Sequence, residues 1–327
     1  MDDLESVVRD HGPWTAMAIK LRDGSYTRAP AVDYRLRRLL QVTADVSRKP
    51  IDKCRVLDLA CLEGHYAIEF ALHGAETLGI EGRSASLAKC EFARQNLGLD
   101  RARFVQDDVR NLSPEKYGIF DVVICSGILY HLPAADALGL LKAIHRCCSG
   151  ILILDTFVSL SGREAVDLHG GLRRGHQYGE HDSGETKQQV ERKAWASLDN
   201  NASFWFTEAS LLNMMQATGF TTLLDVLGPA MPGNPRDRKT YLAVKGVPVP
   251  VRSSDLTHDA PWAELSEDPN PLVDASQYPR GRAFQAAKRF LPQPLKDAIK
   301  PALRAIHVLP PDPTPEFQRK QKGVRDR

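Results

Sequence analysis

From Arg55 to Phe157 the chain alternates two hydrophobic patterns. Short, continuously apolar runs predict strands that are covered on both faces. Longer segments, in which apolar residues recur every three or four positions, predict helices. The expected strands cover residues 55–60, 76–81, 102–109, 120–127 and 150–157, and the expected helices cover 66–74, 84–98 and 135–148. Such alternation predicts a parallel α/β sheet with right-handed crossovers.

This alternation stops after Phe157. Residues 157–203 are polar and rich in glycine and histidine, which predicts a lid or substrate-binding insertion rather than a core element. A helical pattern over 207–220 then precedes two short apolar runs, 221–228 and 239–246. Their Pro/Gly-rich connection is short enough for a hairpin. We therefore expect a mostly parallel sheet that finishes with an antiparallel C-terminal hairpin.

Extensions flank this domain, which we place at residues 51–246. The N-terminal extension, residues 1–50, has a turn signal at Asp23-Gly24 and a helical pattern over 32–46. The C-terminal extension, residues 247–327, is proline-rich and basic.

The charge of the chain is unevenly distributed. Residues 280–327 contain 12 Lys/Arg and 4 Asp/Glu, although the net charge of the whole chain is only +2, so the remainder is acidic. A basic segment on an acidic body indicates contact with phosphate groups or with an anionic membrane surface. A solvated tail without such a role is the alternative.

The composition, 43% hydrophobic and 26% charged, is typical of a soluble globular protein. No apolar run approaches the roughly 18 residues of a membrane span, and the acidic start MDDLESVVRD lacks the signal-peptide pattern. All six cysteines lie between Cys54 and Cys148, with no spacing typical of zinc or redox sites. We expect reduced, mostly buried thiols and a cytoplasmic protein.

Acidic residues follow the first three expected strands, at the sheet edge where open α/β sheets bind ligands. The turn after the first strand reads Asp58-Leu-Ala-Cys-Leu-Glu-Gly64 and contains one glycine. Nucleotides that carry phosphates favour turns with clustered N–H donors and several glycines. An acidic turn repels pyrophosphate but suits S-adenosylmethionine, which has a sulfonium and an ammonium group and no phosphate.

Two further acidic positions complete the expected cofactor site. Glu81, at the end of the second strand, is placed to accept hydrogen bonds from ribose hydroxyls, and Asp107-Asp108, after the third, from an adenine amino group. The alternative is an α/β domain with incidental acids at its strand ends. The expected cofactor-binding residues are Asp58, Ala60, Cys61, Glu63, Gly64, Glu81, Gly82, Asp107, Asp108, Val109 and Ser126.

The chain resembles the class I S-adenosylmethionine-dependent methyltransferases. The segments VLDLACLEG, GIEGR, FVQDDVRNL and FDVVICSGILYHL are similar to successive motifs of that family over roughly residues 54–246. The resemblance implies a Rossmann-like, seven-stranded sheet with helices on both faces, whose last strand is antiparallel.

A narrower resemblance is to the transferases that modify the wobble uridine of tRNA, the carboxymethyl/methoxy uridine group. It rests on GILYHL, NNASFWFTEASLLNMMQATGF and PWTAMAIKLRDGSYT. The chain departs from that group at Thr15-Ala16 and Thr27-Arg28-Ala29, where the tRNA enzymes usually carry a histidine-containing stretch and a TPG sequence.

Candidate catalytic residues follow the fourth expected strand. Methyl transfer to a hydroxyl requires an aligned acceptor, exclusion of water and removal of a proton. His131 is the candidate general base, and Tyr130 is expected to contact cofactor or acceptor. A histidine that bonds only to backbone is the alternative for His131. Candidate substrate-binding residues are Asp155, His176, His181, Trp195, Asn201 and Trp205.

The insertion also contains a cluster of potential metal ligands: His169, His176, Glu180, His181 and Asp182. Their spacing fits no established site, so we expect a polar lid and no metal. Arg28 and Arg173-Arg174 would pair with an acidic group on the acceptor, or else are solvated charges.

These features lead us to expect an S-adenosylmethionine-dependent methyltransferase that acts on a hydroxyl of a small-molecule or sugar-type acceptor. One alternative is a transferase that modifies the wobble uridine of tRNA, with the basic tail binding phosphates. Another is a non-catalytic cofactor-binding protein. Peripheral membrane contact through the basic tail is a further alternative, and we infer no stable protein partner.

Overall fold

The computed structural model describes residues 3–168, 171–182, 184–254 and 263–266. The chain divides into two compact units, Met1–Glu267 and Asp268–Arg327. The second unit, and with it the basic tail over 280–327, lies outside the described residues.

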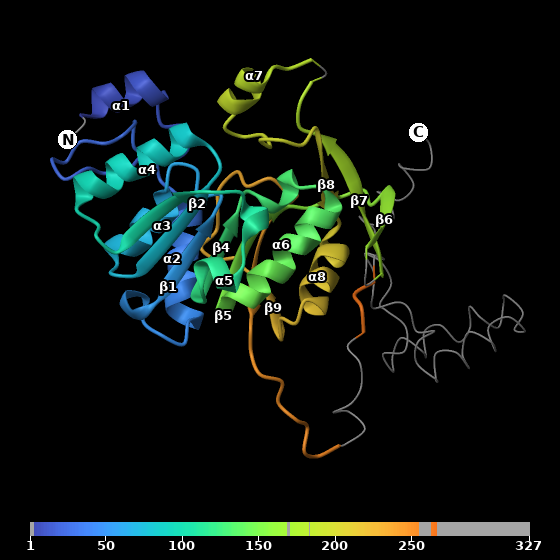
Figure 1. Cartoon of the computed structure of the whole chain (residues 1–327). Coiled ribbons are helices and arrows are strands. Elements are labelled where there is room, and N and C mark those ends of the chain that lie inside the picture. The colour runs from blue at the N-terminus through green and yellow to red at the C-terminus, as the bar shows by residue number, and fades with distance from the viewer. Residues whose placement is uncertain (1–2, 169–170, 183, 255–262, 267–327) are drawn as a thin grey trace, which may run out of the picture. The chain divides into compact units, whose positions relative to one another are not determined.

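The first unit is built on a seven-stranded sheet with the order β3-β2-β1-β4-β5-β10-β9 (Figure 1). The pairs from β3 to β5 are parallel, whereas β10 runs antiparallel to both β5 and β9. This confirms the Rossmann-like fold expected from the sequence, including the antiparallel C-terminal hairpin. The strands are β1 (Arg55–Leu59), β2 (Glu76–Glu81), β3 (Ala102–Gln106), β4 (Phe120–Ser126), β5 (Cys148–Phe157), β9 (Thr222–Asp225) and β10 (Arg238–Val244).

Both faces of the sheet are covered by helices. Alternate side chains of β1 illustrate this, because Val56 packs in the core beside α2 and α3, and Leu57 packs in the core beside α6 and α8. The longer helices are α1 (Leu4–His11), α2 (Tyr34–Val46), α3 (His65–Leu72), α4 (Ser84–Leu97), α6 (Ala134–Cys147) and α8 (Glu208–Ala217), with shorter α5 (Pro114–Tyr117), α7 (Lys187–Arg192), η1 (Ile51–Lys53), η2 (Val109–Asn111) and η3 (Leu129–His131). All six cysteines are buried and none forms a disulfide.

The N-terminal residues pack into this domain. Leu39 of α2 is fully buried in the core against β1, β4 and β5. Trp14 packs against Phe92 of α4, with ring centroids 5.8 Å apart. The segment that we expected to be an extension therefore supplies part of the core and, as shown below, part of the site.

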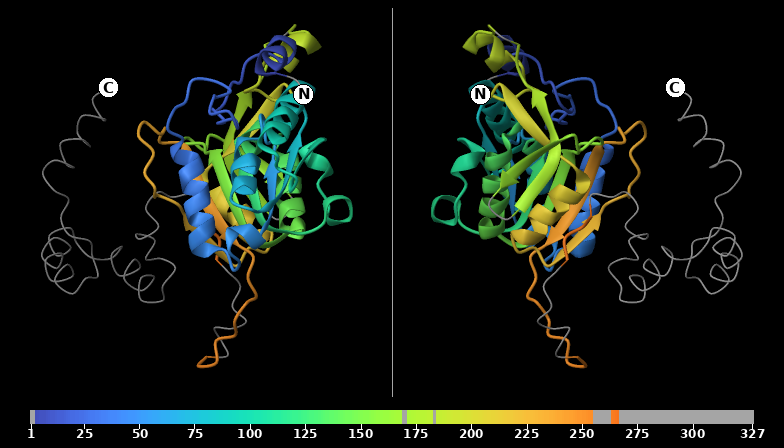
Figure 2. Two further views of the ribbon diagram at one scale, coloured as in Figure 1. Left: turned by 90° about the vertical axis from the view of Figure 1, so that its left-hand side faces the viewer. Right: turned by 90° about the vertical axis from the view of Figure 1, so that its right-hand side faces the viewer.

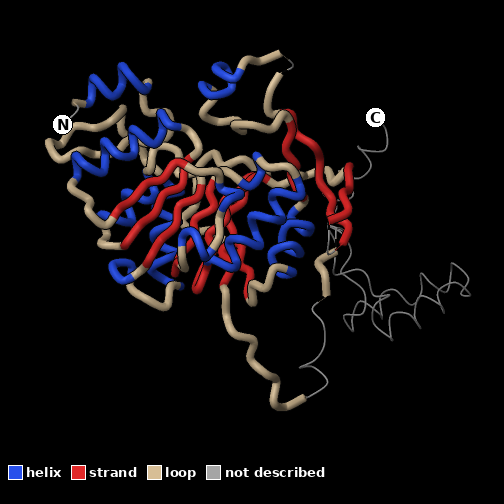
Figure 3. The backbone as a smooth tube through the Cα atoms, in the orientation of Figure 1, coloured by secondary structure: helices blue, strands red, loops and turns tan. Residues whose placement is uncertain are grey.

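The insertion after β5 contains more regular structure than its polar sequence predicts. It forms β6 (Glu164–Leu168), β7 (Gly171–Gly179) and α7, and pairs with β8 (Ala202–Phe206) in a separate antiparallel sheet of order β6-β7-β8 (Figure 3). Figure 2 shows α7 and its connections above the carboxyl ends of the parallel strands. None of the helices in the described part of the chain has the length and apolar character needed to span a membrane.

Candidate active site

The turn between β1 and α3 places three residues in the left-handed region of the backbone. Ala60, Leu62 and Gly64 have φ angles of 51°, 50° and 78°. This region costs a residue with a side chain about 1–2 kcal/mol. At Gly64 a side chain is excluded as well, because its Cβ would lie 2.9 Å from Phe104 Cε1. The turn thus retains the shape of a glycine-rich turn at the two positions where glycine is absent.

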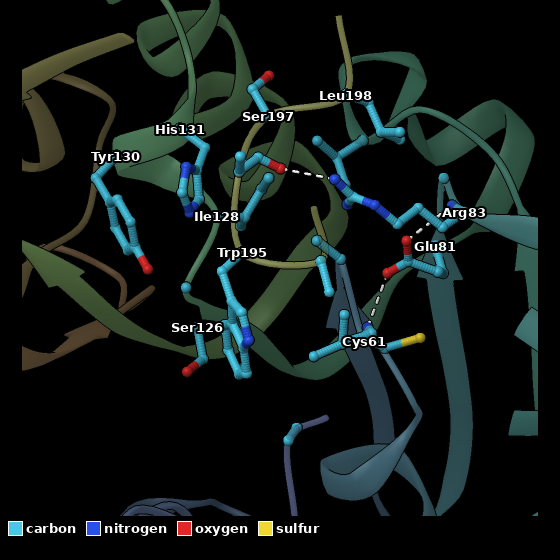
Figure 4. Close-up of a pocket in the computed structure, with 18 of the residues that line it drawn as sticks. Cys61, Glu81, Arg83, Ser126, Ile128, Tyr130, His131, Trp195, Ser197 and Leu198 are labelled. Atoms are coloured by element: carbon cyan, nitrogen blue, oxygen red, sulfur yellow. Dashed lines mark hydrogen bonds between the residues drawn. The ribbon is translucent and has the colours of Figure 1, made fainter. Parts of the chain in front are cut away.

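Glu81, the last residue of β2, ties this turn to the sheet (Figure 4). Its carboxylate accepts hydrogen bonds from the backbone N–H groups of Leu62 and Arg83, each at 2.8 Å. Burial raises the pKa of Glu81, and the two N–H donors limit the increase. Each oxygen keeps a second lone pair, so the carboxylate is able to accept from the hydroxyls of a bound ribose.

Asp58 lies beneath the turn, almost fully buried at the wall of the cavity described below. The backbone N–H of Ala67 donates to its carboxylate at 3.2 Å. Burial raises the pKa of Asp58 to about 7, and the negative charge of Glu81 adds to the effect. A cationic ligand nearby would favour the ionised form of both acids. The acids under the turn therefore match a sulfonium-bearing cofactor better than a phosphate-bearing one.

Glu63 anchors the N-terminal segment. Its carboxylate accepts from the N–H groups of Thr15 and Ala16, at 2.7 and 3.0 Å, and from Lys89 Nζ at 3.1 Å. Glu63 lines the cavity, but the protein itself engages its carboxylate. The contact carries Ala16 and Met17 to the cavity wall.

Asp107 follows β3 at the end of the cavity where adenine is expected. Its carboxylate accepts from Asn111 Nδ2 at 2.9 Å, from Lys116 Nζ at 2.6 Å and from the Tyr117 hydroxyl. Burial acts to raise the pKa of Asp107, but these hydrogen bonds outweigh it and lower the pKa. Asp107 is therefore ionised and held in place before any ligand arrives.

One cavity of 940 Å³ connects the residues expected to bind the cofactor with the insertion. Figure 4 shows Trp195, at the cavity mouth, between Glu81 on one side and Tyr130 and His131 on the other. Of the residues expected to bind cofactor or acceptor, those that line the cavity are Asp58, Ala60, Cys61, Glu63, Glu81, Gly82, Asp107, Asp108, Val109, Ser126, Tyr130, His131, Trp195 and Trp205. Gly64 shapes the turn without lining the cavity.

The insertion is held down over the cofactor end of the cavity by two arginines. Arg83, next to Glu81, donates through its guanidinium to the carbonyls of Lys193 and Ala196, at 2.8 and 2.7 Å. Arg110 pairs with both Asp108 and Asp199. These contacts join the ends of β2 and β3 to the insertion, so the lid is closed in this structure.

Aromatic rings form the wall of the opposite end. Trp205 of β8 stacks on Phe157 and Tyr178, with centroids 4.9 and 4.7 Å apart, and meets the edge of Tyr130 at 5.7 Å. Flat apolar faces of this kind pack well against the ring of a small acceptor. Two of these rings, Tyr178 and Trp205, come from the insertion and its sheet.

His131 is paired with a carboxylate from the insertion. Both carboxylate oxygens of Glu180 lie 3.0 Å from His131 Nδ1, and Glu180 also accepts from Ser197 N–H at 3.0 Å. Burial opposes ionisation of Glu180, but the hydrogen bonds to its carboxylate, that with His131 foremost, and the charge of His131 together outweigh burial and lower the pKa of Glu180. A carboxylate at Nδ1 favours the tautomer with the proton on that nitrogen and leaves Nε2 able to accept a proton.

Four residues expected to touch the acceptor do not line the cavity. Asp155 is fully buried and pairs with Arg238, and the backbone carbonyl of Asn201 accepts from Glu180 N–H. His176 is hydrogen-bonded to the Ser159 hydroxyl, and His181 to the Ser197 carbonyl. Two of the three arginines proposed for an acidic acceptor are also engaged elsewhere. Arg28 donates to the carbonyls of Thr15 and Ala16, and Arg173 pairs with Glu264.

The structure reveals no metal site in the part of the chain that it describes. Among those residues, no group of three or more His, Cys, Asp or Glu side chains is placed to hold a metal ion. His169, a member of the sequence cluster, lies outside the described residues.

Among the cavity residues that sequence reasoning missed are Arg35, Arg83 and Arg238, and it did not connect Glu180 with His131. Arg83 carried a signal, because it directly follows the expected ribose-binding strand end. The others reach the site only through tertiary packing of α2, the insertion and β10, so local sequence patterns did not indicate them.

Comparison with known proteins gives a partial match to curated enzymes. The ubiquinone biosynthesis O-methyltransferase of Acinetobacter baumannii is 34% identical over 89 residues, which are 27% of this chain and 37% of that protein. The 23S rRNA (uracil(1939)-C(5))-methyltransferase RlmD of Thiobacillus denitrificans is 26% identical over 144 residues, 40% of this chain and 32% of that protein. The chain thus spans about a third of the length of these relatives.

Among solved structures, the N-terminal domain of EvdMO1, crystallised in the presence of SAH and D-fucose, is similar in fold. The TM-score is 0.56 at 23% identity, with 75% of this chain and 96% of that chain covered.

The comparison with protein families covers more of the chain. A family model described as a methyltransferase domain matches residues 29–224, more than half of the sequence. The matched region includes α2, the acid-lined turn, Glu81 and the Tyr130-His131 pair. The chain therefore belongs to the methyltransferase-domain family, as one of the S-adenosylmethionine-dependent methyltransferases.

Proposed function

We propose that this protein transfers a methyl group from S-adenosylmethionine to a hydroxyl group of a small, sugar-type acceptor. The observation that carries the proposal is the pairing of His131 with Glu180 at the wall of a lidded cavity. Transfer to a hydroxyl needs a group that removes its proton. An imidazole oriented through Nδ1, with Nε2 able to accept a proton, supplies such a group.

The cofactor end of the cavity fits S-adenosylmethionine. Glu81 is placed to receive the ribose hydroxyls, Asp107 and Asp108 the adenine end, and the turn from Ala60 to Leu62 the amino acid part. When bound, the cofactor supplies an activated methyl group on a sulfonium. The acids that line this end, Asp58 and Glu81, favour that positive charge.

The protein's own residues provide the remaining requirements. His131 Nε2 accepts the hydroxyl proton, and the charge of Glu180 stabilises the imidazolium that forms. Trp205 and Tyr130 hold the acceptor ring by its face. Arg83 and Arg110 keep the insertion closed and exclude water, which brings the acceptor oxygen and the methyl group together without competing hydrolysis.

Two observations support a small acceptor. The insertion covers the cavity through Arg83 and Arg110, which leaves space for a ring-sized molecule rather than a polymer. The similarly folded N-terminal domain of EvdMO1 was crystallised with D-fucose, and a sugar presents hydroxyls of the kind that His131 would deprotonate.

Modification of the wobble uridine of tRNA remains the second candidate. It is favoured by the segments GILYHL and NNASFWFTEASLLNMMQATGF and by the basic residues after position 280. Salt-sensitive affinity of the full chain for tRNA, lost when residues 280–327 are removed, would support it. Affinity for tRNA that is weak and independent of this segment would exclude it.

The decisive experiment uses purified protein, methyl-labelled S-adenosylmethionine and fractionated cell extract. Label should pass to a small hydroxylated product, with one equivalent of S-adenosylhomocysteine released. Label in tRNA would favour the second candidate. Cofactor that binds but is never converted with any fraction would show a non-catalytic binding protein.

A further inference from the structure

Two arginines enclose one buried carboxylate at the acceptor end of the cavity. Asp155, the fully buried residue near the end of β5, accepts from Arg238 Nε at 2.6 Å and from Thr240 Oγ1 at 2.7 Å. Arg35 Nε lies 3.2 Å from the same Asp155 oxygen that binds Arg238. One negative charge therefore holds two positive charges, and both arginines line the cavity.

The remaining groups at this end are hydrogen-bond donors. Arg238 Nη1 donates to the Tyr130 hydroxyl at 3.0 Å, so that hydroxyl keeps its own proton for another acceptor. The indole N–H of Trp205 is buried without a hydrogen-bond partner. A buried donor without an acceptor costs about 1–3 kcal/mol, so this group calls for a ligand that carries an acceptor.

The acids near this end offset only one of the two arginine charges. Asp155 is saturated by Arg238, Arg35 and Thr240. Asp33, which precedes α2, accepts from the backbone N–H of Arg35 and lies 3.5 Å from His65 Nε2, but it does not line the cavity. Glu180 is engaged by His131.

The position of Arg238 assigns it to the acceptor rather than to the cofactor, and Arg35 Nε lies 3.2 Å from the carboxylate that binds Arg238. The adenosine residues Glu81 and Asp107 follow β2 and β3, and the turn for the amino acid part follows β1. Asp155 is on β5 and Arg238 begins β10, on the other side of β4 in the strand order. Tyr130 and Trp205, the acceptor wall, lie beside Arg238, whose guanidinium carbon is 5.1 Å from the Tyr130 ring centroid.

We propose that the acceptor carries an oxyanion group, a carboxylate or a phosphate, which Arg35 and Arg238 bind while its ring lies against Trp205. This inference rests on the proposed function and narrows its substrate class to acidic hydroxyl compounds, such as a uronic acid or a sugar phosphate. Arginine is suited to both oxyanions because its planar N–H pairs match them.

Calorimetric titration of the full chain tests this with three probes of one ring type: D-glucuronate, D-glucose 6-phosphate and D-glucose. Each is titrated with saturating S-adenosylhomocysteine and again without it, at fixed ionic strength. One acidic probe should bind at least about tenfold more tightly than glucose, as expected for charge-assisted hydrogen bonds. The probe that does so distinguishes a carboxylate from a phosphate.

Variants then locate the binding. Arg35→Gln should reduce the affinity for the preferred acidic probe about tenfold and leave glucose unchanged. Arg37→Gln, an exposed arginine on the same helix, is the matched control and should change nothing. Because Arg238→Gln would leave buried Asp155 with only the more distant Arg35 as a charged partner, the double variant Arg238→Gln/Asp155→Asn replaces it and should remove the preference.

Several outcomes would overturn the proposal. Equal affinity for glucose and both acidic probes would do so, as would an acidic preference that survives both variants. Loss of S-adenosylhomocysteine affinity in Arg35→Gln, with the acidic probe unaffected, would assign the arginines to the cofactor carboxylate instead. If S-adenosylhomocysteine fails to bind the unmodified chain, the proposed function fails, whereas its binding without acidic preference refutes this inference alone.

Discussion

Glu180 and His131 are 49 positions apart in the chain, yet the carboxylate of Glu180 lies 3.0 Å from His131 Nδ1. His131 follows a strand of the main sheet, and Glu180 follows β7 in the insertion. The contact therefore forms only when the insertion is folded over the cavity. Lid closure and orientation of the candidate base are thus one structural event.

His131→Ala should lower kcat by about 10²–10⁴-fold, the usual contribution of a general base. The affinity for S-adenosylhomocysteine should stay within twofold, because His131 lies away from the residues expected to bind adenosine. Release of S-adenosylhomocysteine with the identified acceptor measures the first quantity, and calorimetry the second. His73→Ala, at the end of α3, serves as the control, and full activity in His131→Ala would remove this residue as the base.

Glu180→Gln should lower kcat by about 10–100-fold, in the range seen when the hydrogen-bonding partner of a site histidine is lost. Gln keeps the shape and still accepts from Ser197 N–H, so KM and thermal stability should change little. Glu164→Gln, an exposed carboxylate of the same insertion, is the matched control. Equal kcat in both variants would limit Glu180 to a structural role.

Glu81→Ala should weaken the binding of S-adenosylhomocysteine by more than tenfold. The substitution removes the acceptor expected for the ribose and also leaves the Leu62 and Arg83 N–H groups without their partner. Calorimetry measures this affinity. Glu76→Ala, which removes a carboxylate at the far end of the same strand, is the control and should leave the affinity unchanged. Unchanged affinity in Glu81→Ala would refute the assigned cofactor site.

Asp58→Asn should make the cofactor-free protein more stable at pH 8 but not at pH 4. Burial raises the folded-state pKa of Asp58 from 3.8 to about 7, so between these values the folded state binds more protons than the unfolded state. Stability contributed by the protonated group is then lost as pH rises through this window. The difference in free energy of unfolding between variant and unmodified protein, from urea titrations at pH 4, 6 and 8, should grow with pH. A difference that is constant across pH would show that Asp58 is not protonated in the folded state.

The main sheet could be predicted from the sequence because its strands are continuous apolar runs and each is flanked by a helix with its own periodicity. The gathering of acids along one cavity could be predicted for a similar reason. Asp58, Glu81 and Asp107 each end or follow a strand, and parallel strands bring their carboxyl ends to one edge of the sheet.

The acceptor end depends on contacts that no local pattern encodes. Asp155 was expected to touch the acceptor, because it lies near a strand end, but it binds Arg238 and Arg35, from elements 83 residues later and 120 residues earlier. Glu180 was read as one member of a histidine-rich cluster, whereas its partner is His131. In both cases the sequence indicated a functional residue but not its partner. The partner is determined by the packing of the insertion and of α2.

Ala60→Gly should stabilise the protein, because Ala60 has a φ of 51°. Relief of left-handed strain contributes about 1–2 kcal/mol, and the greater freedom of glycine in the unfolded chain offsets about 0.4–1 kcal/mol of it. A net gain of roughly 0.5–1 kcal/mol in the free energy of unfolding is therefore expected from urea titration. Ala67→Gly, inside α3, is the opposite control and should destabilise by roughly 0.5–1 kcal/mol. A loss of stability in Ala60→Gly would show that packing of the Ala60 methyl group stabilises the protein by more than the left-handed strain destabilises it. Side-chain packing would then be the reason why the turn adopts this conformation without glycine at position 60.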